Sequence, residues 1–327
     1  MPDQTPEQLA QRLLNSDRRA LAQAITLVES TLPNHRQQAL QLLEILTPHT
    51  GNSRRIGISG SPGVGKSTFI EALGCYLVEK DHKVAVLAVD PSSTLNGGSI
   101  LGDKTRMEKL ALQTNAYIRP SPAGNTLGGV ARRTRENLLL CEAAGFDTVL
   151  VETVGVGQSE VAVANMTDMF VLMLQPGSGD DLQGIKRGVI ELADLILVNK
   201  ADGASTKLAE KTSRDYQSVL GLLQPKSEHW SPVVEALSAL NGTQFLTVWQ
   251  RIETYFSSLG EHITKQRNTQ NIEWLWSEMA ERLVTELRTN TNVKSAAKSF
   301  ERSVKQGDIP PTIAAEKLLD IFKRSKT

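Results

Sequence analysis

The stretch Gly60-Ser61-Pro62-Gly63-Val64-Gly65-Lys66-Ser67 decides the fold of this chain, because it matches the phosphate-loop pattern G-x-x-x-x-G-K-[ST] without a mismatch. Residues 54–59 (RRIGIS) are typical of a strand entering the loop, and residues 67–80 (STFIEALGCYLVEK) are typical of a helix leaving it. Glycines let backbone N–H groups turn toward phosphate oxygens, and the helix N-terminus adds its positive dipole. The stretch therefore predicts a nucleoside triphosphate site.

The roles within this loop follow from the pattern. Lys66 is expected to reach the β- and γ-phosphates, and Ser67 to offer its hydroxyl to Mg²⁺. The residues expected to line the phosphates are Gly60, Ser61, Pro62, Gly63, Val64, Gly65, Lys66, Ser67 and Thr68.

Composition excludes several other classes of protein. The 36 basic and 36 acidic residues balance, so neither a nucleic-acid nor a membrane partner is indicated. Cys75 and Cys141 are too few for a disulfide framework or a cysteine metal site. The N-terminus lacks a signal-peptide pattern, and no apolar run approaches the ~20 residues that span a bilayer. We expect a cytoplasmic protein.

Three segments follow from the pattern of apolar residues. Residues 1–50 and 261–327 have helical spacing and predict an N-terminal helical layer and a C-terminal helical arm. Residues 51–260 alternate short apolar strands with helical stretches, which predicts an α/β fold with a doubly wound, mostly parallel sheet. Ligands of such sheets bind at the carboxyl ends of the strands. The expected strands are Ile56–Ser59, Val84–Asp90, Ala116–Arg119, Thr148–Thr153, Phe170–Leu174, Leu195–Asn199 and Val233–Ser238.

Asn199-Lys200-Ala201-Asp202 follows one of these strands and fits the N-K-x-D pattern of guanine-specific proteins. A carboxylate at Asp202 would accept hydrogen bonds from the guanine N1–H and exocyclic amine, whereas adenine offers no donor pair there. Lys200 would lay its methylene stem along the base. Ser238-Ala239-Leu240 ends a later strand, where a backbone N–H can reach the guanine O6. Buried polar groups that the wrong base leaves unpaired discriminate strongly, so GTP and GDP are the expected nucleotides.

Acidic residues at strand ends are the expected Mg²⁺ ligands, because this ion prefers oxygen donors. Asp90, Asp103 and Glu152 are expected to join Ser67 around the metal. Gly155 would offer its N–H to the γ-phosphate, and the residues expected to act in hydrolysis are Lys66, Asp103, Glu152 and Gly155. Val156 rather than glutamine follows Gly155, so slow intrinsic hydrolysis is expected.

Seven blocks in order resemble the MeaB/ArgK (MMAA-type) family of methylmalonyl-CoA mutase-associated GTPase chaperones: the phosphate loop, VDPSS, GGSILGDKTRM, RP…LGGVARRTRE, VETVGVGQSE, DDLQGIKRG and VNKADG. The resemblance implies a P-loop GTPase that dimerises through its C-terminal helical arm. It also implies a role in gating adenosylcobalamin loading and in protecting methylmalonyl-CoA mutase or a related mutase. The family's third switch falls on Asp180, Asp181, Gln183 and Lys186.

The chain departs mildly from the family pattern at Asp181, at Arg187 and at residues 123–125 (AGN), and Pro62 stands near the place of an additional loop lysine in related dimeric proteins. Three alternatives stay open. They are a nucleotide-hydrolysing component or kinase linked to amino-acid (lysine/arginine/ornithine) transport, a metallochaperone GTPase, and a scaffold whose nucleotide is structural. Asp202 and the missing membrane segment argue against the first, and the lack of Cys and His clusters argues against the second.

Overall fold

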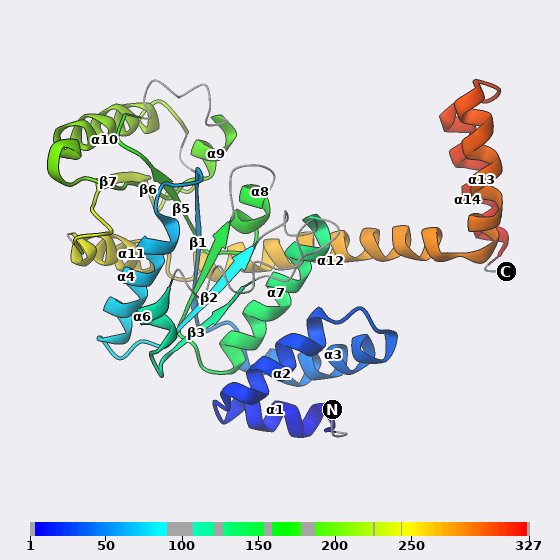
Figure 1. Cartoon of the computed structure of the whole chain (residues 1–327), viewed down its shortest axis with the longest axis horizontal. Helices are drawn as coiled ribbons and strands as arrows, with labels where there is room; N and C mark the ends of the chain where they lie inside the picture. Colours follow the sequence, from blue (N-terminus) through cyan, green and yellow to red (C-terminus); the bar gives the residue numbers. More distant parts are fainter. Residues whose placement is uncertain are drawn as a thin grey trace. The chain divides into compact units, whose positions relative to one another are not determined.

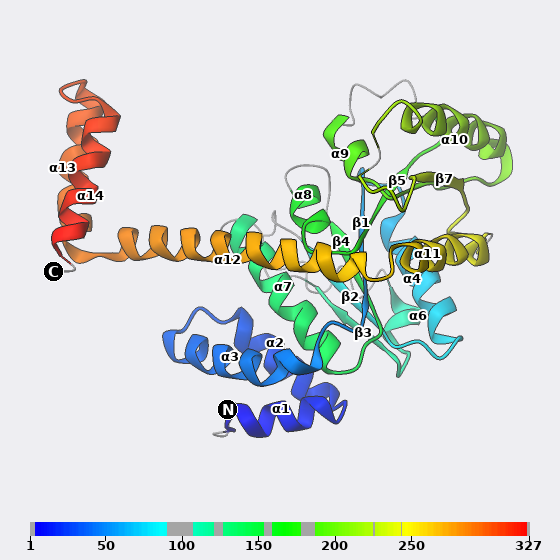
Figure 2. The same cartoon turned by 180° about the vertical axis from the view of Figure 1, so that it is seen from behind.

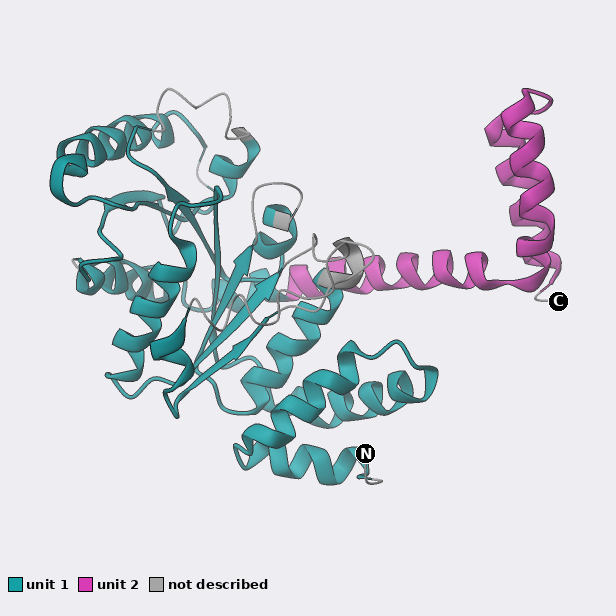
Figure 3. Ribbon diagram, viewed as in Figure 1, with its two compact units in different colours: residues 1–267 teal, residues 268–327 magenta. Residues whose placement is uncertain are grey.

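The computed structural model describes residues 4–89, 107–120, 127–153, 159–177, 187–224, 226–242 and 244–325. It divides into two compact units, Met1–Arg267 and Asn268–Thr327 (Figure 3). None of the described helices is long and apolar enough to cross a membrane.

The first unit is built around a seven-stranded sheet in the order β3-β2-β4-β1-β5-β6-β7 (Figure 1). All its pairings are parallel, as the alternation of strands and helices predicts. The carboxyl ends of the strands therefore meet at one edge, and the phosphate loop, Glu152 and Asn199 lie at this edge. The strands are β1 (Arg54–Gly60), β2 (Val84–Val89), β3 (Ala116–Arg119), β4 (Thr148–Thr153), β5 (Met169–Leu174), β6 (Leu195–Val198) and β7 (Val233–Ala236).

Helices cover both faces of this sheet (Figure 2). The residues of β1 alternate between the faces, so that Ile56 and Ile58 point to one side and Gly57 to the other. The Ile58 side packs against α4 (Lys66–Val78), α6 (Glu108–Ala111) and α11 (Phe245–Leu259). The Gly57 side packs against α7 (Leu127–Ala143), α8 (Ser159–Ala164), α9 (Arg187–Leu192) and α10 (Thr206–Leu220), and the short η2 (Gly203–Ser205) precedes α10.

Three N-terminal helices extend the layer on the α7 side: α1 (Pro6–Leu14), α2 (Arg18–Glu29) and α3 (Pro33–Leu46), followed by η1 (Thr47–His49). A capping box at Thr5 begins α1, and the Asp17 carboxylate accepts from two N–H groups at the start of α2. Their buried leucines join the core of the sheet face, and Arg36 pairs with Glu136 of α7 at 2.5 Å. These helices are therefore part of the first unit's packing.

A buried ionic cluster lies at the edge where the strands begin. The Arg55 guanidinium pairs with Glu142 at 2.8 Å, and the Asp168 carboxylate accepts from the Arg55 backbone N–H at 2.8 Å. Arg267 binds both oxygens of Asp168 at 2.7 Å and donates to the Gly51 and Ser53 carbonyls. The cluster thus holds Arg267, the last residue of the first unit, against the start of β1.

The second unit contains most of α12 (His262–Thr289), with α13 (Thr291–Gln306) and α14 (Pro311–Arg324). Asn290 caps α13, and Val293 and Ala314 are buried where α13 and α14 pack together. No side chain of α12, which is described throughout, is fully buried. Helical spacing gathers its large exposed apolar residues into a stripe of Ile272, Leu275, Trp276, Met279, Leu283 and Val284.

Candidate functional site

The phosphate loop leaves β1 and enters α4, and two of its glycines are required by close approaches. At Gly65 φ is +96°, and a Cβ would lie 2.5 Å from Nδ2 of Asn199. At Gly60 a Cβ would lie 2.5 Å from the carbonyl oxygen of Met173 in β5. A side chain at either position would collide with a neighbouring strand end. The loop is therefore folded against β5 and β6, with its other members Ser61, Pro62, Gly63, Val64, Ser67 and Thr68 around the same turn.

Lys66 begins α4, and its ammonium group points back into this turn. Nζ donates to the Gly60 carbonyl at 2.6 Å and to the Ser61 carbonyl at 3.3 Å, and the residue is only 8% exposed. A buried cation at the N-terminus of a helix suits a polyanionic ligand. The place of Lys66 beside phosphates stays a prediction from the sequence.

The end of β4 lies beside the start of α4. Ser67 Oγ donates to Glu152 Oε1 at 3.1 Å, and Glu152 is 5% exposed. A hydroxyl and a carboxylate are hard oxygen donors, so this pair fits Mg²⁺. Of the other residues expected at the metal or in hydrolysis, Asp90, Asp103 and Gly155 lie outside the described residues.

The residues of the N-K-x-D pattern connect the phosphate loop to a third segment. Asn199 Nδ2 donates to the Val64 carbonyl at 2.8 Å, and its Oδ1 accepts from the Ala239 N–H at 2.9 Å. Lys200, at φ +62°, donates from Nζ to the Gly63 carbonyl at 2.8 Å. One strand end thus holds both the loop and the Ser238-Ala239-Leu240 triplet.

Asp202 is half-buried, and its Oδ2 accepts a hydrogen bond from the Ser238 hydroxyl. The same hydroxyl accepts from the Asn241 N–H at 3.2 Å, so Ser238 is held on both sides. Leu240, the last residue of the triplet, is 81% exposed. The sequence predicted that Ser238-Ala239-Leu240 ends a strand. In the structure β7 ends at Ala236, so this triplet lies in the segment after the strand.

Sequence reasoning overlooked two buried hydroxyl groups, those of Ser59 and Thr153, which are adjacent in the chain to the phosphate loop and to Glu152. Thr153 Oγ1 donates to Ser59 Oγ at 2.9 Å, and both residues are fully buried. Ser59 precedes Gly60, and Thr153 follows Glu152. Polar residues at core positions of apolar strands are the signal that would have found them. Of the third-switch residues, Asp180, Asp181, Gln183 and Lys186 lie outside the described residues, as do residues 123–125.

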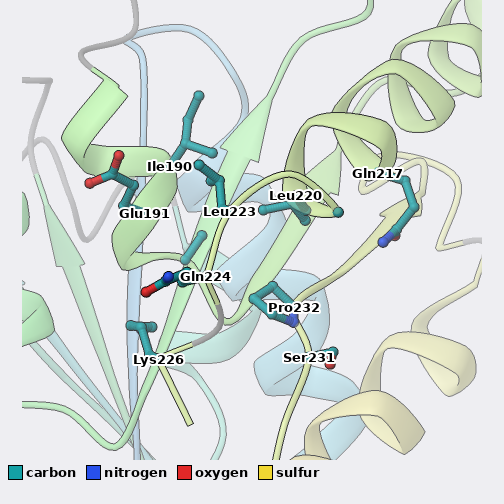
Figure 4. A pocket seen from close by; sticks show the side chains of 11 residues that line it. Ile190, Glu191, Gln217, Leu220, Leu223, Gln224, Lys226, Ser231 and Pro232 are labelled. Carbon is teal, nitrogen blue, oxygen red and sulfur yellow. The ribbon is translucent and has the colours of Figure 1, made fainter. Parts of the chain in front are cut away.

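A separate cavity of about 210 Å³ lies where β6 and β7 begin, at the opposite edge of the sheet (Figure 4). Ile190, Leu220, Leu223 and Pro232 form its apolar lining, and Lys226 stands at one end. None of the residues expected at the nucleotide lines it. The cavity therefore is not part of the site built here.

Comparisons with known proteins agree with this geometry. Residues 21–292 match the family model described as methylmalonyl Co-A mutase-associated GTPase MeaB. A probable GTPase of Mycobacterium tuberculosis is 51% identical over 322 residues, which cover 98% of this chain and 96% of the relative. The mitochondrial methylmalonic aciduria type A homolog of Mus musculus is 45% identical over 324 residues, covering 95% of this chain and 78% of the relative.

Among solved structures, one described as a LAO/AO transport system kinase is 37% identical, covers 99% of both chains and has a TM-score of 0.77. The match to the family model extends over most of the chain, including the phosphate loop, β4 and the N-K-x-D segment. The chain belongs to the MeaB family of methylmalonyl-CoA mutase-associated GTPases.

Proposed function

We propose that this protein binds GTP with Mg²⁺, hydrolyses it slowly, and uses the cycle to gate adenosylcobalamin loading and to protect methylmalonyl-CoA mutase or a related mutase. The observation that carries the nucleotide part is the double hydrogen bond of Asn199. This side chain joins the phosphate loop to the triplet that holds Asp202, so phosphate and base recognition form one assembly. Membership of the family supports the mutase as partner.

The chain's own residues can perform phosphoryl transfer to water. Lys66 and the N–H groups of the loop would stabilise negative charge on the β–γ bridge and on the γ-oxygens. Ser67 and Glu152 would hold Mg²⁺, and Asp90 and Asp103 are the further ligands proposed from the sequence. The ion would neutralise charge that develops on the phosphates. Gly155 would contact the γ-phosphate, so its loop would respond to hydrolysis.

The third-switch residues Asp180, Asp181, Gln183 and Lys186 would relay the nucleotide state to the mutase. The family resemblance supports this assignment, and a partner that orders such elements can raise hydrolysis by about 10³- to 10⁵-fold. We therefore expect the rate to depend strongly on the mutase.

We also propose that the protein is a homodimer whose contact includes the apolar stripe of α12. Ile272 is 59% exposed, Leu275 57% and Trp276 65%, although large apolar side chains usually lie inside. The stripe continues along the helix to Val284. A second copy of the chain would cover it with an equally apolar surface, as symmetric dimers do.

A role in amino-acid transport is the second candidate, because the solved structure at 37% identity is described as that of a LAO/AO transport system kinase. A kinase would pass the γ-phosphate to an acceptor, whereas the proposed GTPase passes it to water. The carboxylate of Asp202 favours a guanine nucleotide. Transfer of label from γ-³²P GTP to a protein or amino-acid acceptor would distinguish the two functions.

The first experiment compares GTP and ATP hydrolysis by the pure protein with and without the organism's methylmalonyl-CoA mutase. Slow GTP-selective turnover that rises on addition of the mutase is expected. Turnover of tens per second without the mutase would contradict the switch. GTP turnover that ignores the mutase would keep the GTPase and contradict the proposed partner.

A further inference from the structure

The pair Ser59 and Thr153 is a polar contact between two strands whose other side chains on this face are mostly apolar. Both residues are fully buried, and Thr153 Oγ1 donates to Ser59 Oγ at 2.9 Å on the sheet face covered by α7 and α8. Replacing two bonded hydroxyls with apolar groups of the same shape is often neutral or stabilising. Folding stability alone therefore gives no reason for hydroxyls at these two positions.

Their position in the sheet gives another reason. The backbone ladder between β1 and β4 ends at the pair Ile58 and Glu152. Ser59 and Thr153 are the next residues on each strand, and beyond them the chain leaves β1 for the phosphate loop. The hydroxyl contact is thus a cross-link between the two strands just after their backbone pairing stops.

Alternation of side chains connects this cross-link to the metal ligands. Because successive residues of a strand point to opposite faces, Thr153 faces α7 and α8 while Glu152 faces α4. Glu152 there accepts from Ser67 at 3.1 Å. A shift of the end of β4 would change the separation of these two oxygens directly, and Mg²⁺ demands near-ideal octahedral geometry.

We propose that Ser59 and Thr153 are a positioning pair that fixes Glu152 relative to Ser67 and thereby sets the affinity of the nucleotide site for Mg²⁺. The pair acts from the opposite face of the sheet. Neither residue touches the ion or the nucleotide. This inference rests on the proposed function, since it assumes Mg²⁺-dependent binding of a guanine nucleotide.

The test uses Thr153→Val, which keeps the shape of the side chain and removes the hydroxyl. Mg²⁺ is titrated into full-length protein with a fluorescent GDP analogue, and the apparent Mg²⁺ dissociation constant is read from the release rate of the analogue. Loss of the hydrogen bond to Ser59 predicts an affinity for Mg²⁺ that is about 2- to 13-fold weaker. Thr153→Ser, which retains the hydroxyl, should restore it.

Thr148→Val is the matched control. Thr148 lies on the same strand, is equally buried, and donates to Asp147 at 2.8 Å at the other end of β4. It should leave the Mg²⁺ dependence within about twofold of wild type. Equal constants for Thr153→Val and wild type would overturn the inference. Should Thr153→Val fail to fold, Ser59→Ala takes its place under the same criterion. Nucleotide binding by the wild type that ignores Mg²⁺ would instead contradict the proposed function.

Discussion

Asp202→Asn is expected to change the base preference of the site from guanine to xanthine. The carboxylate of Asp202 is held by the Ser238 hydroxyl and would accept from both guanine N1–H and the exocyclic amine. The amide oxygen of asparagine can still accept from guanine N1–H, but as a neutral acceptor, and its amide nitrogen would face the exocyclic amine donor to donor. Hydrogen bonds to a charged group contribute about 1.5–3 kcal/mol and neutral ones about 0.5–1.5 kcal/mol, so losing one bond and neutralising the other costs roughly 2.5–4.5 kcal/mol. Affinity for GTP should therefore fall by about 10²- to 10³-fold.

The substituted amide would offer a donor where the carboxylate offered an acceptor. Xanthine carries an oxygen in place of the exocyclic amine, so xanthosine triphosphate should become the preferred ligand. Competition against a fluorescent GDP analogue with GTP, inosine, xanthosine and adenosine triphosphates measures the exchange. Asp215→Asn, on the exposed side of α10, is the matched control. An Asp202→Asn protein that binds GTP within about threefold of wild type would refute the reasoning.

Three further predictions rest on the packing and charges. Gly65→Ala puts a Cβ 2.5 Å from the Asn199 amide at φ +96°, so calorimetry should show at least about 10²-fold weaker GTP binding. Trp276→Glu places a charge in the apolar stripe and should convert a dimer into a monomer in sedimentation, whereas the exposed Lys298→Glu should not. Burial raises the pKa of Glu142, but hydrogen bonds and charge from Arg55 outweigh burial and leave the pKa below 4.5. Its stabilisation is present above pH 4.5 and lost as pH falls through the lowered pKa, so Glu142→Gln should flatten the decrease of melting temperature in acid. Equal acid slopes for both proteins would contradict this.

The sequence predicted the sheet correctly, and it also proposes much of the site, because both leave local signals. Runs such as residues 84–89 (VAVLAV) and 195–198 (LILV) are short, apolar and bounded by polar turns, and each became a strand. The phosphate loop and the N-K-x-D segment are contiguous motifs whose spacing carries their chemistry. Their place at one edge followed from the parallel sheet alone.

Contacts between distant segments left no such signal. Asn199 touches Val64 and Ala239, and nothing in the spacing of these residues announces the contact. Helix α12 begins at His262, although the apolar period starts near Asn271. Its first turns are polar because they supply hydrogen-bonding side chains, among them Arg267, rather than an apolar face. The spacing of apolar residues reveals a helix that buries an apolar face, but it does not reveal helical turns whose side chains form hydrogen bonds.

The Arg267 contact has a practical consequence for anyone who shortens this protein. A recombinant fragment that stops at Gly260, where the strand-and-helix pattern of the sequence ends, loses the guanidinium that neutralises Asp168. The Asp168 side chain is 0% exposed, and stranding a buried carboxylate in this way costs about 3–5 kcal/mol. Whole domains are stable by only about 5–15 kcal/mol. A fragment that extends a few residues past Arg267 keeps the pair, so about two additional turns of α12 separate a stable GTPase fragment from a poorly stable one.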